Sequence, residues 1–287
     1  MQLSESSENV DNLDNAQKCA VFSEASRLCI LAPAGSGKTR VIVKRIEHLC
    51  KSTDLLPSQI VAITFTKKAG YELAKRLSKS FGEQTRERPQ IGTLHSFALG
   101  ELYRYSTENK TKMKSILEDQ HSFAKSLKIS NPTRTLRAIS WCKTRLINPK
   151  DINEENIGTI RRHIHASHLA FDAKQLKKDY ESYLFACRKK SLIDHDDVLL
   201  EYFHKLKDEN YVNTRQFLYR HLFVDEFQDT TPLHMEIYKK LVGKNGCISV
   251  VGDPDQSIFS FAGASDVYLN YFEDFFPGSH TVFLNTN

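Results

Sequence analysis

The segment from Leu28 to Arg40 limits the possible folds of this chain more than any other. A short apolar run ends at Ala32, a turn with two glycines follows, and an amphipathic run starts at Lys38-Thr39. This order predicts a strand, a loop and a helix. Glycines let successive backbone N–H groups point into one concavity, and the N-terminus of the helix adds its positive end. The segment therefore predicts a phosphate-binding loop, and not merely a glycine-rich turn with an exposed lysine.

Two side chains of this loop have the chemistry needed to hold a nucleoside triphosphate and Mg²⁺. Lys38 can reach the β- and γ-phosphates, and the Thr39 hydroxyl can ligate the metal. The usual motif begins with glycine, and Ala32 stands in that place here. Gln17 precedes the loop, and its amide can pair with the edge of an adenine through two hydrogen bonds. Its position favours this role over that of a surface glutamine.

Composition indicates a globular protein of one large or two ordinary domains, since 40% of the 287 residues are hydrophobic and 26% are charged. No apolar run approaches the length of a membrane span, and the polar, acidic N-terminus does not resemble a signal or transit peptide. The six cysteines are scattered, which favours a reducing compartment over a disulfide framework or a zinc site. A net charge of +5 indicates nucleic acid only weakly.

Strand and helix patterns alternate on both sides of a central interruption, which predicts a parallel, doubly wound sheet. Short apolar runs mark the strands, and apolar residues at helical spacing mark the helices. The expected strands are residues 28–32, 60–65, 90–93, 222–224, 247–251 and 280–284. The expected helices are residues 13–22, 38–49, 66–81, 94–105, 232–242 and 267–276.

The interruption, residues 106–191, is helical and basic, and it contains no convincing strand. Residues 121–191 hold 15 lysines and arginines against 6 acidic residues, with aromatic residues interleaved. A basic surface that carries aromatic rings suits a nucleic-acid strand, through phosphate neutralisation and base stacking. The alternative is a solvated helical face above ordinary core aromatics, and the sequence leaves both open. The aromatic residues are Trp141, Tyr180, Tyr183 and Phe185.

The second half of the site follows the strand at 222–224, which leads directly into Asp225 and Glu226. Asp225 can hold Mg²⁺, and Glu226 can orient and deprotonate the attacking water. Gln256 lies just beyond the next strand, at the edge of the sheet where ligands bind in open α/β folds, and its amide could sense the γ-phosphate or the water. Together with Lys38 and Thr39, these residues make nucleotide hydrolysis the leading interpretation.

Seven separated segments, spread over nearly the whole chain, carry a resemblance to one family. They are residues 13–17, 34–40, 64–69, 92–96, 194–197, 224–230 and 252–261. Together they resemble the N-terminal motor domain of superfamily 1 DNA helicases of the UvrD/Rep type. The resemblance implies an α/β fold of the P-loop NTPase (RecA-like) class, a parallel sheet flanked by helices with an all-helical inserted subdomain. Residues 1–105 and 192–287 would form the ATP-binding motor domain, 1A, and residues 106–191 the helical subdomain, 1B.

The resemblance also implies an activity and a setting. The family comprises ATP-dependent helicases that use ATP and Mg²⁺, move 3′ to 5′ on single-stranded DNA and act at junctions of single and double strands in repair or replication. No membrane is implied. The location would be the bacterial cytoplasm, in association with the nucleoid, or the nucleus or mitochondrion of a eukaryote. Two alternatives stay open: the motor part of a helicase–nuclease, and a DNA- or nucleotide-binding module without turnover.

Motif by motif, the resemblance assigns roles to residues of this chain. The catalytic residues would be Lys38, Glu226 and Gln256. The nucleotide would contact Gln17, Ala34, Gly35, Ser36, Gly37, Lys38, Thr39 and Arg40. The metal would be held by Thr39 and Asp225. Single-stranded DNA would contact Phe65, Thr93, His95, Phe259 and Phe261.

The sequence departs from the family pattern in several places. Ala32 and Pro33 alter the start of the phosphate loop, and Phe261 stands where many relatives carry tryptophan. Ala262 stands where many carry arginine, so part of the coupling between DNA and nucleotide is in question. The last residues, 284–287, resemble the start of a motif that continues with an arginine. The expectation is that a C-terminal motor domain is missing from the chain and that turnover needs it, while the oligomeric state stays open.

Overall fold

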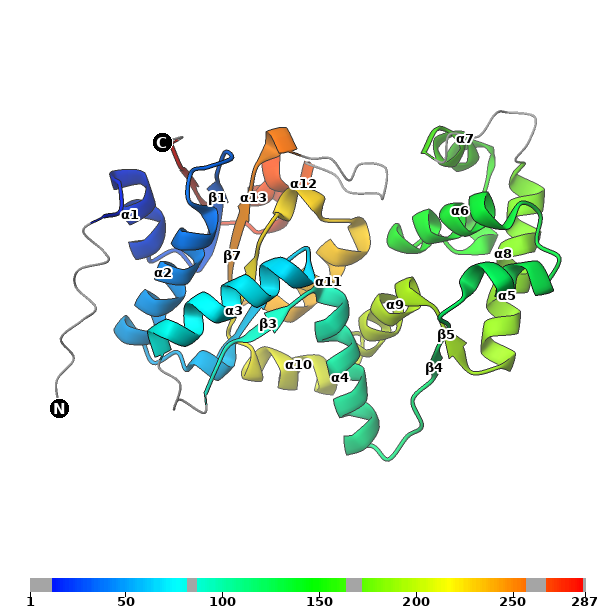
Figure 1. The fold of residues 1–287 in the computed structure, drawn as a ribbon, viewed down its shortest axis with the longest axis horizontal. Helices are drawn as coiled ribbons and strands as arrows, with labels where there is room; N and C mark the ends of the chain where they lie inside the picture. Colours follow the sequence, from blue (N-terminus) through cyan, green and yellow to red (C-terminus); the bar gives the residue numbers. More distant parts are fainter. Residues whose placement is uncertain (1–11, 82–86, 164–171, 257–266, 286–287) are drawn as a thin grey trace.

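A six-stranded sheet forms the centre of the fold, and every neighbouring pair of its strands is parallel. The computed structural model describes residues 12–81, 87–163, 172–256 and 267–285. The strand order is β3-β2-β6-β7-β1-β8, which confirms the expected parallel α/β sheet (Figure 1). The strands are β1 Arg27–Leu31, β2 Ile60–Ile63, β3 Gln90–Gly92, β6 His221–Val224, β7 Cys247–Gly252 and β8 His280–Phe283.

The α-helices fall into two groups: the first flanks the sheet, and the second lies beside it (Figure 1). No helix in the described part of the chain is long and apolar enough to cross a membrane. The first group comprises α1 Asn15–Phe22, α2 Lys38–Ser52, α3 Lys67–Phe81, α4 Leu94–Glu108, α9 His195–Lys205, α10 Glu209–Leu218, α11 Pro232–Val242, α12 Val267–Asn270 and α13 Phe272–Phe275. The second group comprises α5 Gln120–Ser126, α6 Pro132–Thr144, α7 Glu154–His163 and α8 Ala173–Lys189.

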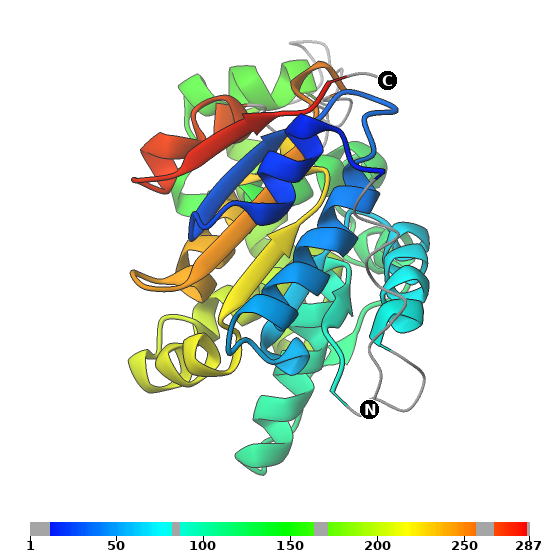
Figure 2. The ribbon, with the colours of Figure 1, turned by 90° about the vertical axis from the view of Figure 1, so that its left-hand side faces the viewer.

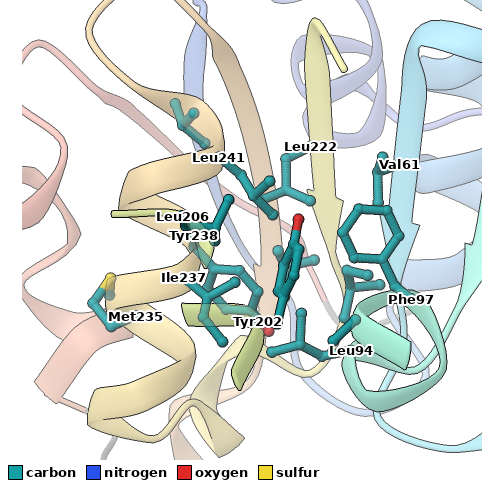
Figure 3. Packing of buried hydrophobic residues seen from close by; sticks show 14 of the residues in the cluster. Val61, Leu94, Phe97, Tyr202, Leu206, Leu222, Met235, Ile237, Tyr238 and Leu241 are labelled. Atoms are coloured by element: carbon teal, nitrogen blue, oxygen red, sulfur yellow. The ribbon is translucent and has the colours of Figure 1, made fainter. Parts of the chain in front are cut away.

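Both faces of the sheet are covered, because alternate residues of each strand point to opposite sides. In β2, Ile60 and Ala62 pack with α1, α2 and α3, whereas Val61 and Ile63 pack with α4, α9, α10 and α11. Figure 2 shows α2 and α3 on one side of the sheet and α10 on the other. Figure 3 shows the buried cluster that contains Val61, on the side of α10. Burial on both faces explains why the inner strands β1, β2, β6 and β7 are mostly apolar runs in the sequence.

The second group of helices has a hydrophobic cluster of its own, formed by side chains of α5 to α8 and the turns between them. Trp141, Tyr180 and Tyr183 belong to this cluster and are buried, so the interpretation of these rings as a stacking surface is wrong. Phe185 is different, since 68% of its surface is exposed. The helical faces above this core carry most of the positive charge of the segment, which is the pattern of a solvated helical face.

One short strand corrects the expectation of an all-helical segment between residues 106 and 191. β4 (Ser115–Ile116) pairs in parallel with β5 (Leu192–Ile193). The backbone N–H of Ser115 donates to Ser191 O at 3.0 Å, and that of Leu117 donates to Ile193 O at 2.8 Å. The pair joins the chain leaving α4 to the chain entering α9. Two-residue strands are too short for a periodic pattern, so the sequence did not reveal them.

A buried ion cluster holds α6 against the start of α9. The side chain of Lys143 has no exposed surface, and its Nζ atom lies 2.6 Å from Asp194 Oδ2 and 2.7 Å from Asp197 Oδ1. The Tyr183 hydroxyl donates to Asp194 Oδ2 at 3.0 Å. Burial alone would lower the pKa of Lys143, but the two carboxylates raise it, so the ammonium is retained. The cluster links the second helical group to the helices that cover the sheet.

All six cysteines lie in the described segments, and all are free thiols. Burial raises the pKa of Cys29 and Cys142 to about 12, so both thiols stay protonated at neutral pH. Buried thiols of this kind act as small hydrophobic side chains rather than as nucleophiles or metal ligands. Cys29 and Cys142 therefore serve as packing residues of the hydrophobic core.

Candidate functional site

The predicted nucleotide residues meet at the edge of the sheet where its strands end. β1 leads into the loop at residues 32–37, β6 leads into Asp225 and Glu226, and β7 leads into Asp253. In the sheet β7 lies between β1 and β6. Because all three strands are parallel, their ends lie at the same edge, where open α/β sheets bind ligands.

The phosphate loop has the backbone conformation that its glycines predict. Gly35 has φ of 79° and Gly37 has φ of 86°, both in the left-handed region where a side chain is strained. Gly37 is the N-cap residue of α2, so the unpaired N–H groups of the first helical turn open onto the loop. A Cβ atom at Gly35 would meet no atom within 4 Å. The loop is therefore an open concavity at a helix N-terminus, which suits an anion.

Gln17 is buried beneath this loop and forms a hydrogen bond to its backbone. Only 2% of its surface is exposed, so the alternative of a surface glutamine is wrong. Its Nε2 atom donates to Ser36 O at 2.9 Å, and its Oε1 atom accepts from the N–H of Asp14 at 3.2 Å. Both polar groups of the amide are thus engaged within the protein in this structure. Thr39 and Arg40 follow in the first turn of α2 and are half-buried.

The loop and the carboxylate pair are joined by an ion pair. Lys38 Nζ lies 3.2 Å from Glu226 Oε2, although the two residues are 188 positions apart. Glu226 itself has φ of 52°, a left-handed conformation that costs a residue with a side chain about 1–3 kcal/mol. Strain of this kind persists only where the surroundings impose it and is common at functional sites. The geometry aims the carboxylate at the phosphate loop.

Gln228 is a site residue that the sequence reasoning did not single out. Its Nε2 atom donates to Glu226 Oε2 at 2.7 Å, and its Oε1 atom accepts from the N–H of Asp253 at 3.1 Å. A Cβ atom at residue 252 would lie 2.7 Å from the same Oε1 atom, so a side chain there would displace the Gln228 amide. Gln256 donates to the Asp253 carboxylate. The only signal in the sequence is an amide two residues after the carboxylate pair.

Asp225 lies beside Glu226 and is largely shielded from water. Its Oδ1 atom accepts from the N–H of Glu226 at 3.0 Å. Burial and the nearby Glu226 carboxylate raise the pKa of Asp225 to about 6. A desolvated carboxylate with a second one beside it favours a cation. With the Thr39 hydroxyl and the open loop, these residues fit Mg²⁺ and a triphosphate.

This raised pKa predicts a pH-dependent gain in stability for Asp225→Asn. A pKa raised from 3.8 to about 6 means that the ionised carboxyl destabilises the fold above pH 6 and that this penalty fades as the pH falls. At about 1.4 kcal/mol per pH unit, the variant should gain about 3 kcal/mol at pH 8 and roughly half of that at pH 5. Thermal unfolding in the presence of a chelator measures it. The exposed Asp255→Asn is the control, and an equal gain at both pH values would contradict the assignment.

Three of the five residues predicted to contact DNA lie in the described part of the chain. Phe65 and Thr93 follow the ends of β2 and β3, which are neighbours in the sheet. Phe65 is 38% exposed, and Thr93 caps α4 by accepting from the N–H of Ser96. His95 is half-buried and lies in the first turn of α4. The structure thus places three of these residues along one edge. Phe259 and Phe261 lie outside the described residues.

Comparisons with known proteins agree with this architecture. The family model described as UvrD/REP helicase N-terminal domain matches residues 13–277. The ATP-dependent DNA helicase PcrA of Leuconostoc citreum is 30% identical over 96% of this chain and 37% of its own length. The proteins of the same name from Staphylococcus epidermidis and Staphylococcus aureus are 30% and 29% identical, over 97% of this chain and 38% of their own length.

The chain therefore spans less than two-fifths of the length of these curated relatives. The matched region includes the phosphate loop, the Asp225–Glu226 pair and the helical segment between them. It also includes the strands whose ends bring these residues together. The resemblance inferred from the motifs is confirmed, and the chain belongs to the UvrD/REP helicase family.

Proposed function

We propose that this chain is the ATP-binding part of an ATP-dependent DNA helicase. The observation that carries the proposal is the 3.2 Å contact between Lys38 of the phosphate loop and Glu226, with Asp225 next to it. ATP would place its γ-phosphate between these groups. The lysine would then exchange its carboxylate partner for phosphate oxygens and neutralise part of their charge.

In this proposal the chain's own residues orient and deprotonate the attacking water. Glu226 would accept the proton, and Gln228 would hold the carboxylate in place through the 2.7 Å hydrogen bond. Gln256, which follows the end of β7 in the turn Pro254–Gln256, would respond to the γ-phosphate or the water. Thr39 and Asp225 would hold Mg²⁺, which neutralises charge that develops on the phosphate oxygens.

The proposed nucleotide contacts are those that the family resemblance implies. The open backbone of the loop supports phosphate binding, as does its position at the N-terminus of α2. The adenine would lie near Gln17 and Arg40, and Gln17 would have to release one of its present partners to pair with the base. The loop contacts would come from Ala34, Gly35, Ser36, Gly37 and Lys38.

The proposed substrate is single-stranded DNA, including junctions with duplex DNA, with movement from 3′ to 5′ and a role in repair or replication. The printed names of the relatives, ATP-dependent DNA helicase PcrA, support a DNA substrate. Their length supports a second motor domain that works with this one. Their bacterial origin supports a cytoplasmic location near the nucleoid. The proposed DNA contacts are Phe65, Thr93, His95, Phe259 and Phe261.

We also propose a division into two parts. Residues 1–105 and 192–287 would form the motor domain 1A, and residues 106–191 the subdomain 1B. The separate hydrophobic cluster of α5 to α8 supports this division. So does the position of these helices beside the sheet rather than on it (Figure 1).

Lys38→Ala tests the nucleotide site. Removing one member of a shielded charged pair costs about 2–5 kcal/mol, so Mg·ATP should bind at least about 30-fold more weakly. Lys38 lies outside the hydrophobic clusters, and the fold should therefore persist. Calorimetric titration measures the affinity, and circular dichroism checks the fold. Lys51→Ala, an exposed lysine of the same helix, is the matched control. Equal ATP affinity in all three proteins would refute the proposal.

A further inference from the structure

Three side chains with metal-binding atoms lie close together where α4 meets α9. His95 lies in the first turn of α4, and His195 and Asp196 lie in the first turn of α9. One ligand atom from each lies within 4.8 Å of the other two. Imidazole nitrogens and a carboxylate are a common ligand set for divalent transition metals. These residues are brought together by the fold, since α4 and α9 are about a hundred positions apart in sequence.

His95 has an unsatisfied atom in this cluster. Its Nε2 atom is buried and has no hydrogen-bond partner among the described residues. Buried polar atoms are nearly always bonded, and an exception calls for an ion, a water or a functional role. Burial, His195 and His234 lower the pKa of His95 to about 3. The ring is therefore neutral at ordinary pH, which is the form that binds a metal.

Asp196 adds negative charge that the described residues do not balance with an ion pair. The close contacts of Lys143 are with Asp194 and Asp197 rather than with Asp196. A divalent cation beside Asp196 would supply an opposite charge and favour its ionised carboxylate.

We propose that His95, His195 and Asp196 form a binding site for a divalent transition metal of the Zn²⁺ class. The two imidazole rings are stacked, with centroids 3.8 Å apart and planes at 22°, so their nitrogens do not yet converge. His195 is the exposed member and has to turn off the stack, and water completes the coordination. The bound metal ties α4 to α9, which also packs on α6. This site goes beyond the proposed ATP-dependent activity, although it shares His95 with the proposed DNA contacts.

Cobalt is the probe, because protein-bound Co²⁺ absorbs visible light and takes the place of Zn²⁺. We expect the chelator-treated chain to bind one Co²⁺ saturably and to melt at a higher temperature with the metal. His195→Phe keeps an aromatic ring stacked on His95 but removes the imidazole ligand. Asp196→Asn removes the negative charge of the carboxylate. Each variant should weaken Co²⁺ binding by more than about tenfold and abolish the thermal shift. Loss of an outer-shell partner of a metal ligand usually costs at least about tenfold in affinity, and these residues are direct ligands.

His121→Gln is the matched control, since this histidine is exposed on α5 and lies outside the cluster. It should bind Co²⁺ as the unaltered chain does. Far-ultraviolet circular dichroism verifies folding, and His195→Gln replaces His195→Phe if the phenylalanine variant fails to fold. The proposal is overturned if the unaltered chain shows no saturable Co²⁺ spectrum. It is also overturned if the His195 and Asp196 variants bind Co²⁺ as tightly as the control.

Discussion

In a full-length version of the protein, Glu226→Gln is expected to lower the rate of ATP hydrolysis by about 10² to 10⁴ while Mg·ATP still binds. The amide keeps the size and shape of the side chain but cannot accept the proton of the attacking water. Lys38 and Gln228 now contact the carboxylate at 3.2 and 2.7 Å, so the position of the side chain should be maintained. Single-turnover hydrolysis in the presence of single-stranded DNA measures the effect, because that assay reports the chemical step alone.

The control for this variant is Glu72→Gln, an exposed glutamate of α3 that pairs with Arg76 in its own helix. Its hydrolysis rate should equal that of the unaltered protein. Nucleotide affinity, measured separately, distinguishes loss of the base from loss of binding. Turnover of Glu226→Gln within a factor of about two would show that another group acts as the base.

Lys143→Ala is expected to destabilise the fold by about 3–5 kcal/mol, the usual cost of breaking a buried ion pair from one side. The variant leaves Asp194 and Asp197 shielded from water and without their shared cation. The Tyr183 hydroxyl, at 3.0 Å from Asp194, cannot supply the missing charge. Urea-induced unfolding followed by circular dichroism measures the free energy of unfolding.

Lys178→Ala provides the comparison, since this lysine is exposed on α8. Its effect should stay within about 0.5 kcal/mol, as for most surface substitutions. If the two variants lose the same stability, the buried cluster does not hold α6 to α9. A loss for Lys143→Ala that is smaller near pH 4 than at pH 8 would support the ionic origin, because without the lysine the buried aspartates take up protons as the pH falls.

The centre of the sheet was predictable from the sequence because its inner strands are buried on both faces. Runs 60–65 and 247–251 are largely apolar, broken only by Thr64 and Ser249. Strand β2 lies within the first run, and β7 covers the second and ends one residue later. Helix ends were less accurate: α4 continues to Glu108, three residues beyond the expected end. The expected strand at 60–65 ends at Ile63, because the chain turns there toward α3.

The nucleotide residues were predictable because each follows a strand of one parallel sheet. Lys38, Asp225 and Glu226 come from separate motifs, yet parallel strands place their ends at one edge. Gln228 was not found, since its role depends on two hydrogen bonds that span β6 and β7. The burial of Gln17 was also not predictable, because a single polar side chain gives no periodic hydrophobic signal.

The helical segment shows where composition misleads. Lys143 counts toward the positive charge of residues 121–191, but its side chain is enclosed by acidic residues and contributes nothing to a surface. Trp141 and Tyr183 belong to the same basic segment of the sequence and still face inward. Helical periodicity assigns a residue to a face, but only the packing of the helices decides which face is the core. His95 and His195 likewise meet only through the packing of α4 on α9.

The central claim is that the loop at residues 32–37 and the Asp225–Glu226 pair form one Mg·ATP site. A crystal structure of residues 1–287 with Mn²⁺ and a non-hydrolysable ATP analogue tests it most directly, since Mn²⁺ is located by its anomalous scattering. The predicted result is a nucleotide-dependent Mn²⁺ peak beside Thr39 and Asp225, with Lys38 turned from Glu226 to the γ-phosphate. A triphosphate bound elsewhere, or one bound while the 3.2 Å contact between Lys38 and Glu226 persists, would contradict it.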